Sequence, residues 1–193
     1  TILDYMALEN AVITLQYSFM ETYAKNEIEK KYQRDIEYSL LNGLLTGDEL
    51  SKAAGMLKLK DTAQYCVVSF HTISSNSEDY YTKEELEEIG VIEGEIQRLL
   101  PDEHIYQNLN QIVCIHEIKP GETQAGFREE MEKLYQTVQK QIFHRNKTTD
   151  FQIGIGSIVN GYGDLKKSFK DSKKIIDYMD MLRYLYGDKN ISV

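Results

Sequence analysis

The sequence predicts an α+β protein in which one long N-terminal helix precedes a small antiparallel sheet packed with helices. Two observations carry this prediction. No glycine or proline occurs between Asp4 and Tyr38, so one helix can run unbroken over this range. From Gln64 onward, short apolar runs typical of strands alternate with segments of helical periodicity, in the order β-α-β-β-α-β-α.

The long helix is expected over residues 4–38, and its apolar side chains repeat with a period of seven. They occupy positions a and d of the heptad: Tyr5, Leu8, Val12, Leu15 and Phe19. The same register places Asn26 at a, with Thr22 and Glu29 at d, so the apolar seam weakens along the helix. We expect the seam, with Asn26 included, to form a parallel dimer contact. The alternative is a helix that packs on a neighbouring domain.

Two shorter helical pieces are expected between residues 38 and 59, separated at Thr46-Gly47-Asp48. The first piece, residues 36–45, is rich in leucine. A buried strand follows at residues 64–72. After a polar loop at residues 74–81, Thr82-Lys83-Glu84-Glu85 is a capping box that opens a helix reaching about Leu100.

The second half of the chain contains three strand-like runs and two helices. A weak strand at residues 103–106 and a strong strand at residues 111–118 predict a hairpin. A helix is expected at residues 123–143, and another strand begins at Phe151. This order is the split βαβ, ferredoxin-like arrangement, an antiparallel sheet with helices on one face. Its two most apolar strands are then expected side by side in the centre.

The last long helix has clearly separated faces. Its apolar side contains Leu165, Phe169, Ser172, Ile176 and Met179. Five lysines lie on the opposite side: Lys166, Lys167, Lys170, Lys173 and Lys174. A further helical segment is expected at residues 178–186.

Composition excludes several classes of function. A net charge of −9 and a pI near 5.0 argue against a DNA-gripping surface. No apolar run approaches the roughly 20 residues that cross a bilayer, and no signal peptide is evident, so a soluble cytoplasmic protein without membrane contact is expected. Cys66 and Cys114 lie in apolar runs and are expected to be buried free thiols. Because the chain begins at Thr1 without a methionine and stops as an apolar pattern restarts, we interpret it as a fragment of a longer protein.

The residues offer few chemical signals. Gly154, Gly156, Gly161 and Gly163 lie between a strand and a helix, as in a phosphate-binding loop, but their spacing matches no such motif and favours a structural role. The four histidines (His71, His104, His116 and His144) have no metal-ligand spacing, although His71 and His116 could approach each other if their strands pair. No metal site or cofactor is predicted.

The strand GIGSIV followed by the helix LKKSFKDSKKII resembles the GGDEF-like domain of PucR/CdaR-type bacterial transcription regulators, the families that control purine catabolism and sugar-diacid use. In that family a G-I-G strand precedes a helix of pattern L-x-x-S-[YF]-x-[ED]-[AS]. The matching residues are Leu165, Ser168, Phe169, Asp171 and Ser172. Upstream, ALENA at residues 7–11 and DIEYSLLNGLL at residues 35–45 are similar to the family's connecting helix. Related segments also occur in some AraC-type regulators.

The resemblance implies a degenerate, non-catalytic domain. Distant relatives are diguanylate cyclases, which carry GGDEF on the hairpin between the second and third strands, where acidic side chains help hold Mg²⁺. Here that position reads Asn108-Leu109-Asn110-Gln111-Ile112, and the end of the first strand, which should supply another aspartate, reads Ser69-Phe70-His71-Thr72. Amides bind Mg²⁺ poorly, and without the metals phosphoryl transfer loses its main charge stabilisation.

The resemblance therefore implies a regulatory module that relays a signal from an upstream sensor to a downstream helix-turn-helix. Residues 1–46 are expected to form the connecting and dimerisation helix, and residues 47–193 the GGDEF-like domain. DNA would be contacted only through a helix-turn-helix outside this chain. The alternatives are a module that binds a small-molecule effector or nucleotide in the degenerate cleft and, more remotely, a divergent cyclase or phosphodiesterase. Candidate ligand contacts are Ser69, His71, Ser74, Ser75, Asn108 and Asn110.

Overall fold

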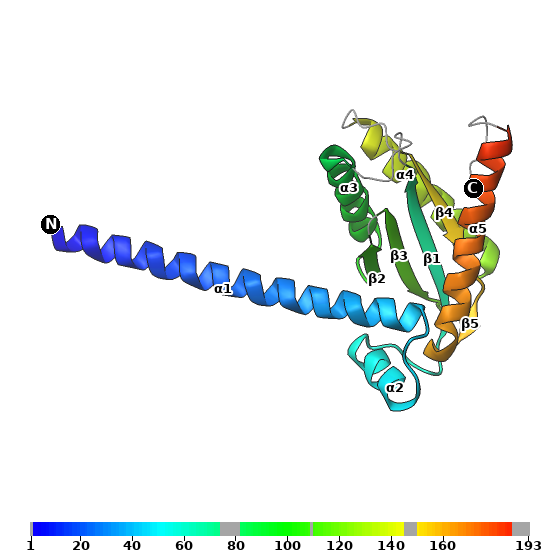
Figure 1. Ribbon diagram of the computed structural model, residues 1–193, viewed down its shortest axis with the longest axis horizontal. Helices are drawn as coiled ribbons and strands as arrows, with labels where there is room; N and C mark the ends of the chain where they lie inside the picture. The colour runs from blue at the N-terminus through cyan, green and yellow to red at the C-terminus, as the bar shows by residue number, and fades with distance from the viewer. Residues whose placement is uncertain (1, 74–81, 109, 145–149, 187–193) are drawn as a thin grey trace. The chain divides into compact units, whose positions relative to one another are not determined.

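The computed structural model describes residues 2–73, 82–108, 110–144 and 150–186. The chain divides into two compact units, residues 1–37 and residues 38–193, and each is described by itself. As predicted, an antiparallel sheet with helices follows a long N-terminal helix (Figure 1).

Helix α1 (Ile2–Leu41) makes up the first unit, and its last turn belongs to the second. The helix is longer than expected, because residues 36–41, assigned from the sequence to a separate short helix, continue it without a break. It ends at Gly43, whose φ of +64° is favourable only for glycine. The amides of Gly43 and Leu44 donate to the carbonyls of Leu40 and Ser39 and so satisfy the end of the helix. Helix α2 (Gly47–Met56) follows near the predicted break.

The sheet has the strand order β2-β3-β1-β4, and every pair is antiparallel. Its strands are β1 (Gln64–Ile73), β2 (His104–Asn108), β3 (Gln111–Glu117), β4 (Asp150–Ile155) and the short β5 (Val159–Asn160). The central position of β1 and β3 confirms the prediction from their apolar character. Strand β5 also pairs with β1, one residue out of register with β4, so β4 and β5 form one strand line interrupted by a bulge.

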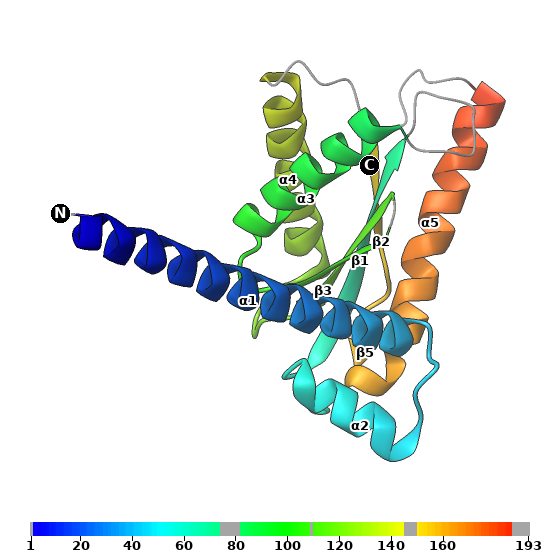
Figure 2. The same cartoon turned by 60° about the vertical axis from the view of Figure 1, so that its left-hand side comes forward.

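Helices α3 (Lys83–Leu99) and α4 (Gln124–His144) cover one face of the sheet (Figure 2). The predicted capping box is confirmed: the Thr82 hydroxyl accepts from the Glu85 amide, and the Glu85 carboxylate accepts from the Thr82 amide. Alternate strand residues face these helices because side chains of a strand point to opposite sides. They form the main core with residues that include Cys66, Val68, Phe70, Ile92, Ile96, Ile112, Cys114, Met131, Val138 and Ile153.

Helix α5 (Leu165–Tyr186) covers the opposite face, preceded by the short 3₁₀ turn η1 (Tyr162–Asp164) (Figure 2). The prediction that all helices share one face holds for α3 and α4 but is wrong for α5. The segment at residues 178–186, expected as a separate helix, is the end of α5. The separation of faces along α5 is confirmed, since Leu165, Phe169, Ser172, Ile176 and Met179 are buried.

The glycines of β4 allow α5 to lie directly on the sheet. A Cβ at Gly154 would collide with the main-chain oxygen of Ser172, and one at Gly156 with that of Ser168. In the space that these glycines leave, the Ser168 hydroxyl accepts from the amide of Val67 at 2.8 Å. The structural interpretation of these glycines is therefore confirmed, and the helix is hydrogen-bonded to the sheet as well as packed on it.

Candidate functional site

The end of the sheet where β1 stops beside the turn of the β2–β3 hairpin, which we call the hairpin edge, contains the predicted ligand contacts His71, Asn108 and Asn110. Asn108 and Gln111 form the last strand pair before the hairpin turn. The main-chain oxygen of Asn110 accepts from the Thr72 amide at 2.9 Å and from the Thr72 hydroxyl at 3.1 Å. The side-chain amide of Asn110 hydrogen-bonds to Nε2 of His71. Asn110 thus ties the hairpin to the end of β1.

His71 contributes a neutral imidazole to this edge. Burial lowers its pKa, and the charges of Asp180 and Asp177 on α5 oppose that shift without reversing it. A neutral ring can accept the amide hydrogen of Asn110 at Nε2 while its proton resides on Nδ1. The edge therefore presents an imidazole and amides, which are neutral groups and poorer Mg²⁺ ligands than carboxylates.

The predicted ligand contacts are only partly brought together. His71 and Asn110 touch, and Asn108 is exposed at the end of β2. Ser69 is fully buried on the α5 side of the sheet, where its hydroxyl lies 2.7 Å from that of Ser172. Because the single hydrogen of Ser172 is donated to the Phe169 carbonyl, Ser69 is the donor in this pair. The Ser69 hydroxyl is buried and hydrogen-bonded to α5, so its position does not favour contact with a ligand.

Ser74 and Ser75 lie outside the described residues, so the ligand site as a whole stays a prediction. The expectation that His71 and His116 meet is wrong, although their strands do pair. The register sets His71 opposite Gln111 and His116 opposite Cys66, at different ends of the strands. The two side chains also point to opposite faces of the sheet, because His116 shares the face of Cys66 and His71 that of Ser69.

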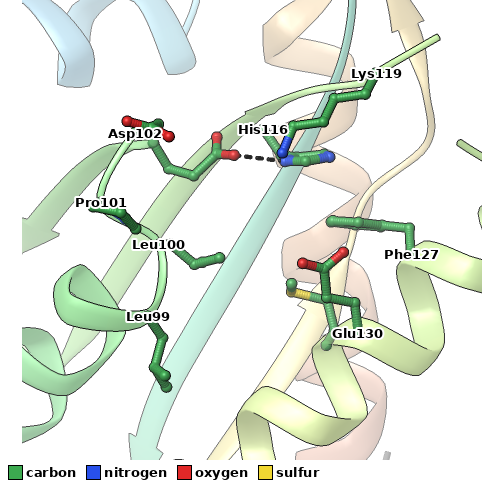
Figure 3. Close-up of a pocket in the computed structure, with 10 residues that line it drawn as sticks. Leu99, Leu100, Pro101, Asp102, His116, Lys119, Phe127 and Glu130 are labelled. Atoms are coloured by element: carbon green, nitrogen blue, oxygen red, sulfur yellow. Dashed lines mark hydrogen bonds and ion pairs between the residues drawn. The ribbon is translucent and has the colours of Figure 1, made fainter.

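A second site, which the sequence did not indicate, is a cavity of about 210 Å³ between the end of α3 and the first half of α4 (Figure 3). Leu99, Leu100, Phe127 and Met131 form its apolar walls. Its polar groups are Asp102, Glu103, His116, Lys119 and Glu130. Acidic side chains outnumber basic ones in this lining.

His116 lies on the cavity wall between two carboxylates. Its Nδ1 is 2.8 Å from Glu103, and its Nε2 is 3.0 Å from Glu122. Its ring is stacked on Phe127, with centroids 4.4 Å apart. Burial disfavours the charged ring, but the hydrogen bonds and charges of Glu103, and then of Glu122, outweigh it, so the pKa of His116 is raised.

No local sequence pattern predicts the arrangement around His116. Glu103 lies 13 residues before His116 and Glu122 lies 6 residues after it, and only the hairpin and the turn before α4 bring them together. Cys66 and Cys114, on the same face of the sheet, are buried free thiols as predicted. Among the described residues, no three His, Cys, Asp or Glu side chains converge as a metal site.

The predicted dimer seam lies on helix α1. Tyr5, Leu8, Val12, Leu15 and Phe19 are all exposed on the helix surface, as is Asn26. Whether this seam contacts a second copy stays a prediction. Within the described ranges, the helices are too short or too polar to span a bilayer.

The chain matches a known protein family. The model of the GGDEF-like domain matches residues 42–178, from the end of α1 to the second half of α5. The matched range contains the hairpin edge, the His116 cavity and the contact between α5 and the sheet. No curated protein matches the chain. Because the matched range covers well over half of its length, the chain belongs to the family of GGDEF-like domains.

Proposed function

We propose that the chain is a non-catalytic regulatory and dimerisation module of a cytoplasmic bacterial transcription regulator of the PucR/CdaR type. It relays a signal from an upstream sensor to a downstream helix-turn-helix. An AraC-type regulator, which can carry related segments, is the alternative parent. The family match supports the domain, and the resemblance of residues 7–11 and 35–45 to the connecting helix supports the parent.

The observation that carries the non-catalytic role is the bonding of Asn110 at the hairpin edge. Its carbonyl accepts from Thr72 and its amide bonds His71, so the hairpin and the end of β1 bind each other with neutral groups. A cyclase needs carboxylates here to hold Mg²⁺ against the phosphates. Incubation with GTP and Mg²⁺, and separately with a cyclic dinucleotide, should give no turnover. Turnover that Asn110→Ala abolishes would overturn this part of the proposal.

The relay is supported by the way α1 enters the domain. Leu40 and Leu41, in the last turn of the helix, are 2% and 1% exposed within the second unit. Tyr38 packs against Tyr106 of β2, with ring centroids 6.4 Å apart. A helix without a break whose end is part of the core passes a rotation or shift directly to the domain.

Dimerisation is supported by the exposed seam of α1. The apolar a and d residues give way to Thr22, Asn26 and Glu29, so this part of the seam is only weakly stabilised by apolar contact. The Thr22 hydroxyl bonds the Ser18 carbonyl of its own helix. In the proposed dimer, a small shift of one α1 helix along the other would therefore cost little free energy, which suits a helix that transmits a signal in this way.

Sedimentation velocity at tens of micromolar tests the dimer. We expect a dimer for the parent chain and a monomer for Leu15→Asp, because a carboxylate in an apolar seam is not solvated. The matched control is Thr14→Asp, which adds the same charge at the neighbouring position, away from the seam, and should remain dimeric. A monomeric parent chain, combined with unaltered regulation by Leu15→Asp in the full protein, would refute the proposal.

A second candidate function is the binding of a small-molecule effector at the hairpin edge. The observation that favours it is the exposed Asn108 amide near the half-buried His71 and Asn110. Calorimetric titration with guanine nucleotides, purine catabolites and sugar diacids tests it. Binding should weaken in Asn108→Ala, whereas heat signals equal in both proteins, or absent from both, would exclude this site.

A further inference from the structure

His116 joins two connections that leave the sheet at the same end. Glu103 ends the connection between α3 and β2, and Glu122 lies in the connection between β3 and α4. The carboxylates of Glu103 and Glu122 are only 13% and 14% exposed, so water competes little for them. The ring of His116 is therefore the bridge between the two connections.

The geometry fixes the protonation state that closes this bridge. An ionised carboxylate only accepts hydrogen bonds, so both ring nitrogens must carry hydrogens to satisfy both partners. A neutral imidazole has one N–H, and its other nitrogen would turn a lone pair toward a carboxylate. The bridge is thus complete only for the imidazolium, whose stacking on Phe127 adds a cation–π attraction.

We propose that His116 is a proton-operated latch that ties the α3–β2 connection to the β3–α4 connection when charged and releases one of them when neutral. The latch does not depend on the regulatory role proposed above. Glu122 is also held by its own turn, since the Lys119 amide donates to its carboxylate at 2.8 Å. The turn itself therefore survives release, and the link between the two connections is what is lost.

The charges around the ring favour the closed state. The α3–β2 connection contributes Asp102 and Glu103, and the β3–α4 connection contributes Lys119 and Glu122. Helix α4 contributes Glu130. The residue opposite His116 on β1 is Cys66, a neutral thiol. Glu117, next to His116 on β3, is paired with Lys60. Around the ring, the carboxylates of Asp102, Glu103, Glu122 and Glu130 outnumber the ammonium group of Lys119, so the net charge stabilises the imidazolium. His116 and Glu103 line the 210 Å³ cavity, so release of the latch would loosen this part of its wall.

The direction of the pH dependence follows from the raised pKa of His116 in the folded protein. A raised pKa means that the folded state holds the proton more tightly than the unfolded chain, whose histidine titrates near about 6.5. The stabilisation is fully present below that unfolded value and is lost as the pH rises through the folded pKa. The latch is thus closed in acid and opens on the alkaline side.

NMR titration of the histidine rings is the first test. His104 is the internal control, because burial lowers its pKa and no clamp of two carboxylates surrounds it. We expect the midpoint of His116 to lie above that of His104, because the pKa of His116 is raised and that of His104 is lowered. In Glu103→Gln the midpoint of His116 should fall. A midpoint at or below that of His104, or one unchanged in Glu103→Gln, overturns the proposal.

Hydrogen–deuterium exchange of the parent chain and His116→Gln, compared at the same pH, locates the latch. At pH near 6 the amides of residues 102–104, Lys119 and residues 121–123 should exchange about tenfold faster in the variant, because both carboxylates lose their cation. At pH near 9 the two proteins should exchange alike there, because the parent latch is already open. Equal exchange at the lower pH, or an undiminished difference at the higher pH, would refute it. If His116→Gln does not fold, the titration of Glu103→Gln decides.

Discussion

Replacement of Gly154 by alanine tests how closely α5 lies on the sheet. The new Cβ would overlap the main-chain oxygen of Ser172 and approach Cγ1 of Ile176 to 3.0 Å. The isoleucine can rotate, but a carbonyl within a helix cannot move without the helix, so α5 must lift. Overpacking of this kind costs about 1–3 kcal/mol, and loss of the Ser69–Ser172 hydrogen bond adds roughly 1 kcal/mol. The reduced entropy of the unfolded chain returns about 0.4–1 kcal/mol.

We therefore expect Gly154→Ala to lower the free energy of unfolding by about 1–3 kcal/mol, measured by urea denaturation followed by circular dichroism. The matched control is Gly94→Ala on α3, where nothing lies within 4 Å of the added carbon. Alanine is the better helix former, so the control should gain about 0.5–1 kcal/mol. If Gly154→Ala is as stable as the parent chain, α5 does not rest on β4 at the distance described, and the structural explanation of these glycines is wrong.

Three further predictions concern the same domain. Gln152→Leu should raise the free energy of unfolding by about 1–2 kcal/mol in urea denaturation, because this buried carboxamide has no hydrogen-bond partner among the described residues; a loss of stability would contradict this. Thr82→Ala should cost about 1 kcal/mol in the same assay, since the Glu85 amide loses its capping oxygen, whereas Thr82→Ser should cost little; equal losses would argue against the cap. Burial raises the pKa of Cys66 to about 11 and that of Cys114 well above its usual range, so neither native thiol should react with a thiol reagent near pH 8; rapid labelling without denaturant would disprove their burial.

The elements that the sequence predicted well are those whose determinants are local. The capping box needs only Thr82 and Glu85, which are three residues apart and bring every atom of the motif with them. Pairing of β1 with β3 followed from two apolar runs long enough to be central strands. The end of α1 was predicted too early, near Tyr38, whereas the helix continues to Leu41 and the chain turns away at Gly43, which adopts a positive φ.

The face covered by α5 could not be read from its amphipathic pattern. That pattern shows which side of a helix is buried but not which side of the sheet it lies on. The continuous apolar character of β1 was a usable signal, because a strand that is buried on both sides belongs to a sheet covered on both faces. The His116 latch had no such signal, since its partners come from separate connections that only the folded chain brings together.

The family resemblance rests on residues of β4 and α5, whereas catalysis would depend on residues of the hairpin edge. Packing of α5 on the sheet restricts the size of the first group and not of the second. Where a helix lies directly on strand backbone, only small residues fit between the two, because any larger group would lift the helix. In this domain the small residues are Gly154, Gly156, Ser168 and Ser172. The hairpin edge has no such requirement, because Asn110 joins the hairpin to the end of β1 through hydrogen bonds between neutral groups. A match in the strand and helix around α5 is therefore informative about how the chain folds. Activity has to be judged separately, at the hairpin edge, by the turnover assay with GTP and Mg²⁺.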